Sequence, residues 1–317
     1  IRQSESAIDK AYKFTGGPDN SLEDLVAPIA SWFGQAMDRV RAGQETMEQK
    51  AARGYARTLQ KLEGKHDTSR QIFTGMREFD SRFGAFDVFE EDWLIGVGAL
   101  TSVGKSAFTR KIIDYNLQDK KGADGKVIEG KKGIVFLLET SIAKWLDLAA
   151  CTATRINSRH LQELPKDLKE KFKEARAIRE AWIGKRLWIF DESIKVETLC
   201  ARVDEHVRQH GRVDFVVVDH LHELYSTQNF RGNREPELGY IAKELKKIAK
   251  RLNIPFFVPV QLNRSSSKEG HRRPTKHDLR GSGEIENAFD RLLLLHIPKE
   301  DMRGAEQTDN QARIMIE

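Results

Sequence analysis

One short segment, residues 99–106 (ALTSVGKS), constrains the fold of this 317-residue chain more than any other. It follows an apolar run, residues 93–97, that predicts a buried strand, and it precedes residues 107–113, whose apolar pattern predicts a helix. A strand, a short loop, Gly-Lys-Ser and a helix are the context of a phosphate-binding loop. The alternative is an ordinary strand-to-helix turn that contains a lysine.

The loop predicts a nucleotide site in which particular residues have particular roles. Backbone N–H groups of such a loop, together with the N-terminus of the following helix, attract phosphate. We expect Lys105 to reach the β- and γ-phosphates of ATP and the Ser106 hydroxyl to bind Mg²⁺. Ala99 stands where such loops usually begin with glycine, with Gly96 and Gly98 just upstream. The predicted cofactor-binding residues are Thr101, Ser102, Val103, Gly104, Lys105 and Ser106.

Hydrophobic strands alternate with helices through residues 71–317, which predicts an α/β fold with a mostly parallel sheet and helices on both faces. The expected strands are 93–97, 133–138, 186–190, 213–218, 254–260, 292–295 and 312–316. The expected helices are 105–117, 141–156, 168–182, 196–209 and 236–252. Residues 119–125 are interpreted as a charged surface insertion.

The N-terminal part of the chain differs from the rest. Residues 1–20 are polar and are interpreted as a tail, and residues 21–70 as linker helices, one over 21–40 and one over 45–62. These helices carry a narrow apolar stripe, which can pack on their own domain or on an adjacent subunit. Periodicity does not separate these two alternatives.

Polar residues follow three of the expected strands. In parallel sheets the carboxyl ends of the strands form the ligand-binding edge. We therefore assign Asp219 to Mg²⁺ and Glu139 to activation of the attacking water. The alternative for each carboxylate is an N-cap of the following helix. Gln261, after the strand 254–260, is a candidate sensor of the γ-phosphate.

Basic residues concentrate in one segment of a chain whose net charge is +5. Residues 263–280 contain six Lys and Arg residues against two acidic ones, and the serines and glycine among them predict a loop. Such a segment suits contact with nucleic-acid phosphates, or it is a solvated loop. The candidate DNA-binding residues are Arg264, Lys268, Arg272, Arg273, Arg280, Gly281 and Gly283.

Composition excludes several other classes of protein. No apolar run approaches the roughly 20 residues of a membrane span, and the start of the chain does not resemble a secretory signal. Cys151 and Cys200 are interpreted as reduced thiols of a cytoplasmic protein. His206 and His210 lie four residues apart on an expected helix, but no nearby Cys or carboxylate completes a metal site.

Five ordered motifs resemble those of the DnaB-type hexameric replicative helicases. After residues 99–106 come 138–141 (LETS), 218–220 (VDH), 260–264 (VQLNR) and 278–283 (DLRGSG). The Asp-His and Leu-Arg-Gly-Ser-Gly wording is closest to the phage helicase-primase type. The resemblance covers the chain from about residue 72 to its end.

The resemblance implies a RecA-like P-loop ATPase motor domain, here residues 71–317, in a hexameric ring around single-stranded DNA. By similarity, Lys105 and Ser106 bind ATP and Mg²⁺, Asp219 is the second Mg²⁺ partner, and Glu139 is the catalytic base. Gln261 is the γ-phosphate sensor, and the basic loop faces DNA. The helix near 21–40 matches the linker helix that docks on the adjacent subunit.

The predicted function is therefore an ATP-dependent, replicative DNA helicase that moves 5′-to-3′, with a primase or loader as a possible partner and no membrane. The alternatives are a RecA-like recombinase ATPase and a non-catalytic, nucleotide-gated DNA-binding assembly subunit. The family's N-terminal domain is not matched by this sequence. Its arginine finger lies beyond the strand at which the sequence stops, so we expect a truncated C-terminal end and assign no finger.

Overall fold

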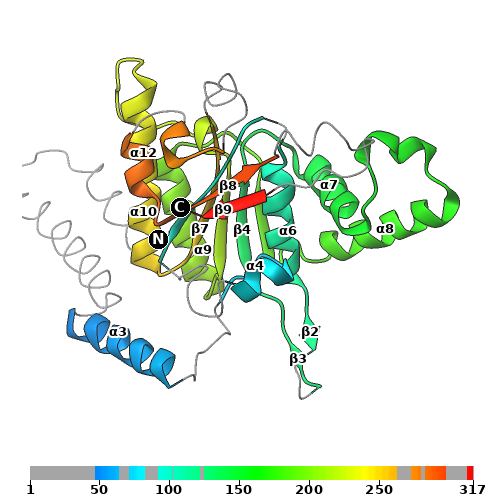
Figure 1. The fold of residues 1–317 in the computed structure, drawn as a ribbon, viewed down its shortest axis with the longest axis horizontal. Coiled ribbons are helices and arrows are strands. Elements are labelled where there is room, and N and C mark those ends of the chain that lie inside the picture. The colour runs from blue at the N-terminus through cyan, green and yellow to red at the C-terminus, as the bar shows by residue number, and fades with distance from the viewer. Residues whose placement is uncertain are drawn as a thin grey trace, which may run out of the picture. The chain divides into compact units, whose positions relative to one another are not determined.

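The computed structural model describes residues 47–63, 71–82, 92–101, 103–121, 125–262, 273–279, 283–297 and 313–316. The chain divides into two compact units, Ile1–His66 and Asp67–Glu317. The first unit contains helix α3 (Met47–Leu62), close to the expected helix over 45–62 (Figure 1). The expected helix over 21–40 and the polar tail lie outside the described residues.

The second unit is built on a seven-stranded sheet in the order β5-β4-β6-β7-β1-β8-β9. All neighbouring strands pair in parallel except β8 and β9, which are antiparallel, so the mostly parallel sheet is confirmed. The strands are β1 (Leu94–Ala99), β4 (Gly133–Leu137), β5 (Leu187–Phe190), β6 (Phe215–Asp219), β7 (Phe256–Gln261), β8 (Arg291–His296) and β9 (Arg313–Ile316).

The helices begin and end within about three residues of their expected bounds. They are α4 (Arg77–Arg82), α6 (Lys105–Leu117), α7 (Ile142–Thr154), α8 (Lys166–Glu180), α9 (Val196–His210), α10 (Arg234–Leu252) and α12 (Gly283–Ala288), with short 3₁₀ turns η2 (Ser158–Glu163), η3 (Leu221–Glu223) and η4 (Lys276–Asp278). The charged insertion is part of a small hairpin of β2 (Lys120–Lys121) and β3 (Val127–Ile128).

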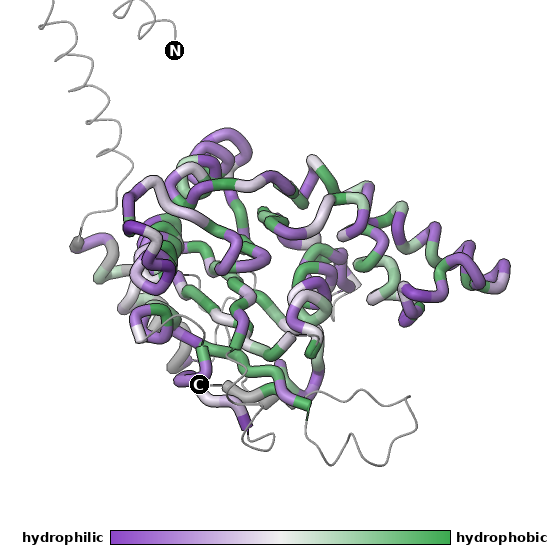
Figure 2. The backbone as a smooth tube through the Cα atoms, turned by 90° about the horizontal axis from the view of Figure 1, so that it is seen from above, coloured by the Kyte–Doolittle hydropathy of each residue, from purple (hydrophilic) through white to green (hydrophobic). Residues whose placement is uncertain are grey.

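The sheet is covered on both faces because its strands are apolar on both faces. In β7, Phe256 and Val258 pack with α9, α10 and α12, while Phe257 points to the opposite face and packs with α6 and α7. Successive side chains of a strand point to opposite faces, so each strand contributes to two hydrophobic cores. Figures 1 and 2 show these helices flanking the apolar strands.

The register of the parallel strands brings their carboxyl ends to one edge. Ala99, the last residue of β1, pairs with Gln261 of β7, and Leu137 of β4 pairs with Asp219 of β6. The loops that leave these strands therefore start side by side. Within the described residues, none of the helices has the length and apolarity needed to cross a membrane.

Candidate active site

The loop after β1 turns sharply into α6 at Gly104. Its φ angle is +109°, a conformation that glycine adopts far more readily than other residues. Gly104 is the N-cap residue of α6, and no side chain caps this end of the helix. The first backbone N–H groups of α6 therefore remain available to an anion. Ser102 lies outside the described residues.

Lys105 points back along this loop and toward two carboxylates. Its Nζ donates to the carbonyl oxygen of Ala99 at 3.2 Å. Burial lowers the pKa of Lys105, and the carboxylates of Asp219 and Glu139 act in the opposite direction. The three residues predicted from separate motifs thus lie within electrostatic reach of one another at one edge of the sheet.

Asp219 ends β6 and accepts a hydrogen bond from the Ser106 hydroxyl. Burial raises the pKa of Asp219, while His220 and Arg110 oppose that shift. Carboxylate and hydroxyl oxygens are hard ligands of the kind that Mg²⁺ prefers. Because Ser106 and Asp219 are in direct contact, this pair fits a Mg²⁺ ion beside the phosphate-binding loop.

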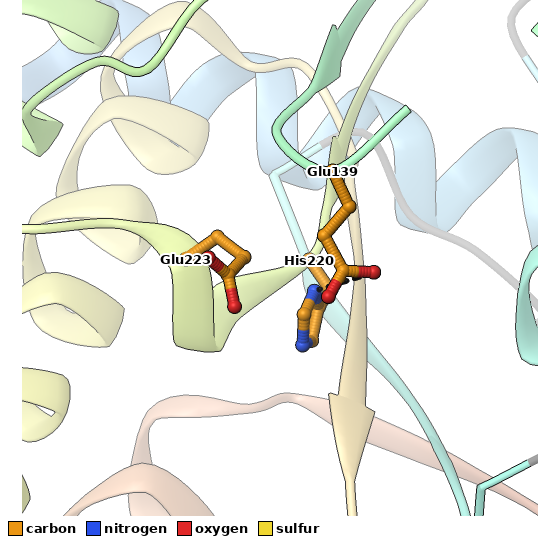
Figure 3. A group of neighbouring side chains, drawn as sticks. All are labelled: Glu139, His220 and Glu223. Carbon is orange, nitrogen blue, oxygen red and sulfur yellow. Dashed lines mark ion pairs between the residues drawn. The ribbon is translucent and has the colours of Figure 1, made fainter. Parts of the chain in front are cut away.

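Neither carboxylate caps a helix, so that alternative is wrong for both. Ser141 is the N-cap of α7, and its side chain accepts from Lys144 N at 3.4 Å. His220 is the N-cap residue of η3, without a side-chain capping bond. Glu139 instead projects from the loop after β4, with its side chain 60% exposed and its Oε2 3.7 Å from His220 Nδ1 (Figure 3).

Gln261 connects the end of β7 to the phosphate-binding loop. Its Nε2 donates to Thr101 Oγ1 at 3.0 Å. Thr101 is itself a predicted loop residue and is exposed. A change in the loop can therefore reach β7 through a single hydrogen bond.

Three residues at this edge were given no role by the sequence patterns. Arg110 lies one helical turn after Ser106 on α6 and faces Asp219 electrostatically; the i, i+4 spacing was the available signal. His220 and Glu223 come together with Glu139, and the ligand atoms of these three side chains all lie within 4.8 Å of one another. No sequence spacing indicates that cluster, because its members leave different strands.

The basic segment is described only in part. Leu262 forms an antiparallel bridge with Leu279, so both ends of the segment start beside β7. Arg273 and Gly283 are exposed. Lys276, counted among the basic residues, forms an ion pair with Glu286 at 3.0 Å, which reduces the charge available to a nucleic acid. Arg264, Lys268, Arg272, Arg280 and Gly281 lie outside the described residues.

The His206–His210 pair packs against an aromatic residue. The two imidazole centroids lie 4.3 Å apart, and both rings contact Trp188. Within the described ranges, the one group of three potential metal ligands is that of Glu139, His220 and Glu223. The histidine pair therefore gains no third ligand from the described part of the chain.

Comparison with known proteins identifies relatives of this chain. The sequence model for the DnaB-like helicase C terminal domain matches residues 71–317. The replicative DNA helicase DnaB of Helicobacter pylori is 27% identical over 226 residues, which cover 71% of this chain and 43% of the relative. The DnaB of Geobacillus stearothermophilus is 27% identical over 246 residues, covering 75% of this chain and 50% of the relative. The chain thus spans about half the length of these relatives.

Two solved structures share its fold. One is an isolated ATPase domain, which superimposes with a TM-score of 0.65 at 19% identity, covering 84% of this chain and 93% of that one. A DnaB-like replicative helicase, described with its interactions with primase, gives a TM-score of 0.65 at 18% identity, covering 99% of this chain and 73% of that one. Together with the match over residues 71–317, the RecA-like fold establishes that the chain belongs to the DnaB-like helicase C terminal domain family.

Proposed function

We propose that this chain is the motor domain of an ATP-dependent replicative DNA helicase that moves along single-stranded DNA. The observation that carries the proposal is the gathering of Lys105, Ser106, Glu139 and Asp219 at one edge of the sheet. A phosphate cradle, a magnesium pair and a carboxylate beside them are the parts that nucleotide hydrolysis requires. Family membership supports DNA unwinding as the use of that hydrolysis.

In this proposal the loop N–H groups and Lys105 bind the phosphates of ATP. Ser106 and Asp219 hold Mg²⁺, which when bound neutralises charge on the phosphates. Glu139 accepts the proton of the attacking water. Its side chain is 60% exposed, so it is open to water before nucleotide binds.

Hydrolysis is coupled to DNA through the end of β7. Gln261 contacts Thr101 on one side, and Leu262 and Leu279 frame the basic segment on the other. We propose that the segment grips the phosphate backbone, through Arg273 and Gly283 and through candidate residues outside the described ranges. Loss of the γ-phosphate then changes that grip. By family likeness, movement is 5′-to-3′.

Assembly is also part of the proposal. We propose a homohexameric ring with a primase or loader as a partner, in the cytoplasm. In α3, Tyr55 and Leu59 lie one helical turn apart and are both exposed, at 66% and 38%. An adjacent subunit is a fitting partner for that apolar pair. A mass of six chains in the presence of an ATP analogue and an oligonucleotide would support the ring, and a stable monomer would contradict it.

The central test is ATP hydrolysis with and without single-stranded DNA. We expect Lys105→Ala to lose nucleotide binding, and Glu139→Gln to retain binding but hydrolyse about 10²–10⁴-fold more slowly, the usual contribution of a general base. Lys111→Ala is the matched control, because it removes the same charge from an exposed position of the same helix. Normal hydrolysis by Glu139→Gln would refute the assigned base.

A second test addresses DNA. Reversing the charges of Arg272 and Arg273 should flatten the salt dependence of single-strand binding, by about 0.7 in the log–log slope for each phosphate that the protein no longer neutralises. Lys250→Glu is the control, because this exposed lysine lies near the end of α10 that leads into the start of β7, opposite the proposed DNA edge. An unchanged slope in the double variant would exclude the basic segment from DNA binding.

A further inference from the structure

Three potential metal ligands meet beside the nucleotide site although they leave different elements. Glu139 follows β4, His220 follows β6, and Glu223 ends η3. Their ligand atoms all lie within 4.8 Å of one another. Figure 3 shows the three side chains converging on one point. Two carboxylates and an imidazole form a donor set that differs from the all-oxygen pair of Ser106 and Asp219.

The imidazole of His220 is an independent sign that this point binds something. His220 is only 8% exposed, and its Nδ1 has no hydrogen-bond partner in the described part of the chain. This nitrogen faces Glu139 Oε2 at 3.7 Å, beyond hydrogen-bonding distance. A buried imidazole nitrogen without a partner is costly, and a bound cation would use its lone pair.

The backbone beneath the cluster is fixed in advance. Leu221 and Leu224, on either side of Glu223, are both fully buried. Arg234 donates to the carbonyl oxygens of His222 and Leu224, each at 2.6 Å. The turn that carries Glu223 is therefore held by packing and by a charged hydrogen-bond donor from α10.

We propose that Glu139, His220 and Glu223 form a site for a divalent cation of the zinc type. Zn²⁺ accepts imidazole and carboxylate ligands in a tetrahedron and leaves a fourth position to water, whereas Mg²⁺ requires six oxygens. At metal–ligand distances of about 2.1 Å, tetrahedral ligand atoms lie about 3.4 Å apart. The 3.7 Å between Glu139 and His220 is already near that value, and the exposed Glu139 side chain can rotate inward.

Occupation of this site has a consequence that rests on the proposed function. A carboxylate that ligates Zn²⁺ cannot accept the proton of the attacking water. Zinc would therefore slow hydrolysis without displacing ATP, since Lys105 and the Ser106–Asp219 pair lie outside the zinc ligands. The site is thus a means of holding the motor in its nucleotide-bound state.

The first test measures binding of Zn²⁺ alone to the nucleotide-free chain by titration calorimetry, with Co²⁺ absorption as a report of tetrahedral geometry. Glu223→Gln should weaken binding by at least about 10–100-fold, since loss of even an outer-shell partner has that effect. His210→Asn is the matched control, because it removes the exposed histidine of the other pair. Unchanged binding in Glu223→Gln, or abolished binding in His210→Asn, would overturn the site.

The second test titrates Zn²⁺ into ATP hydrolysis at fixed Mg²⁺. Glu223→Gln should keep the basal rate of the unaltered chain and require at least about tenfold more zinc for half-inhibition, in line with its weaker binding. Equal sensitivity of the two proteins would overturn the proposed consequence. A chain that binds zinc through Glu223 but hydrolyses no ATP would support the site and refute the proposed function, so the two failures are distinguishable.

Discussion

Gly104 provides the sharpest test of the nucleotide site, because a methyl group there meets no neighbouring atom. An added Cβ would have nothing within 4 Å, so Gly104→Ala creates no steric overlap with the rest of the chain. Its effect comes from the backbone alone, since φ is +109°. An alanine must either stay in a left-handed conformation, at about 1–2 kcal/mol, or relax and turn the loop N–H groups.

Gly184 is the matched control for this substitution. It has a φ of +75°, and a Cβ there would also meet nothing within 4 Å. Gly184 lies before β5, at the amino edge of the sheet and therefore opposite the nucleotide site. Both variants should lose about 1–2 kcal/mol of folding stability. For a domain of about 250 residues, that loss lowers Tm by roughly 2–8 °C.

Only Gly104→Ala should lose nucleotide affinity. If relaxation turns one loop N–H away from the phosphates, the loss is about 1.5–3 kcal/mol for a hydrogen bond to a charged group, or at least about tenfold in Kd. The assay combines thermal denaturation with titration of a fluorescent ATP analogue. Equal affinities of the two variants, with equal decreases in Tm, would refute the reasoning that the left-handed turn builds the phosphate cradle.

Two further predictions concern the stability of the second unit. Gly133→Ala should lower the free energy of unfolding by about 1–3 kcal/mol in chemical denaturation, because its Cβ would overlap the ring of Phe215, which is fully buried; an unchanged midpoint would contradict the tight packing of β4 on β6. Arg179→Met should cost about 3–5 kcal/mol at neutral pH, since it leaves Asp114 half-buried without the partner that now lies 2.6 Å away. Burial raises the pKa of Asp114 and Arg179 opposes that rise, so in the variant the carboxyl is more readily neutral. A carboxyl with a raised folded pKa weakens the folded state as pH rises above its unfolded value of about 3.9, so the loss should shrink as pH is lowered toward 4; a loss that does not depend on pH would show that packing, not charge, explains it.

Most of the fold followed from hydrophobic pattern. The strands of this sheet are buried on both faces, so each appears as a short apolar run such as residues 133–138, and the helices between them keep a helical period. Local signals also sufficed at Ser141, which was expected to cap α7 and does. The hairpin of β2 and β3 was missed because two-residue strands carry no period that a sequence can display.

The site was predictable where a strand end announced it. Asp219 and Gln261 each end a strand, and a parallel sheet brings such positions to one edge. Their closest partners were less predictable. The contact of Ser106 with Asp219 joins α6 to β6, and no local pattern specifies which side chains meet between elements more than a hundred residues apart.

By itself, the sequence determined the class of fold, the phosphate-binding loop and the identity of the residues at the strand ends, because these depend on periodicity and on short motifs. Only the tertiary structure decided that Glu139 caps no helix, that Arg110 faces Asp219, and that Glu139, His220 and Glu223 converge. Those facts depend on the register Leu137 to Asp219 and on the turn that Arg234 holds, and register is set by packing across the whole sheet.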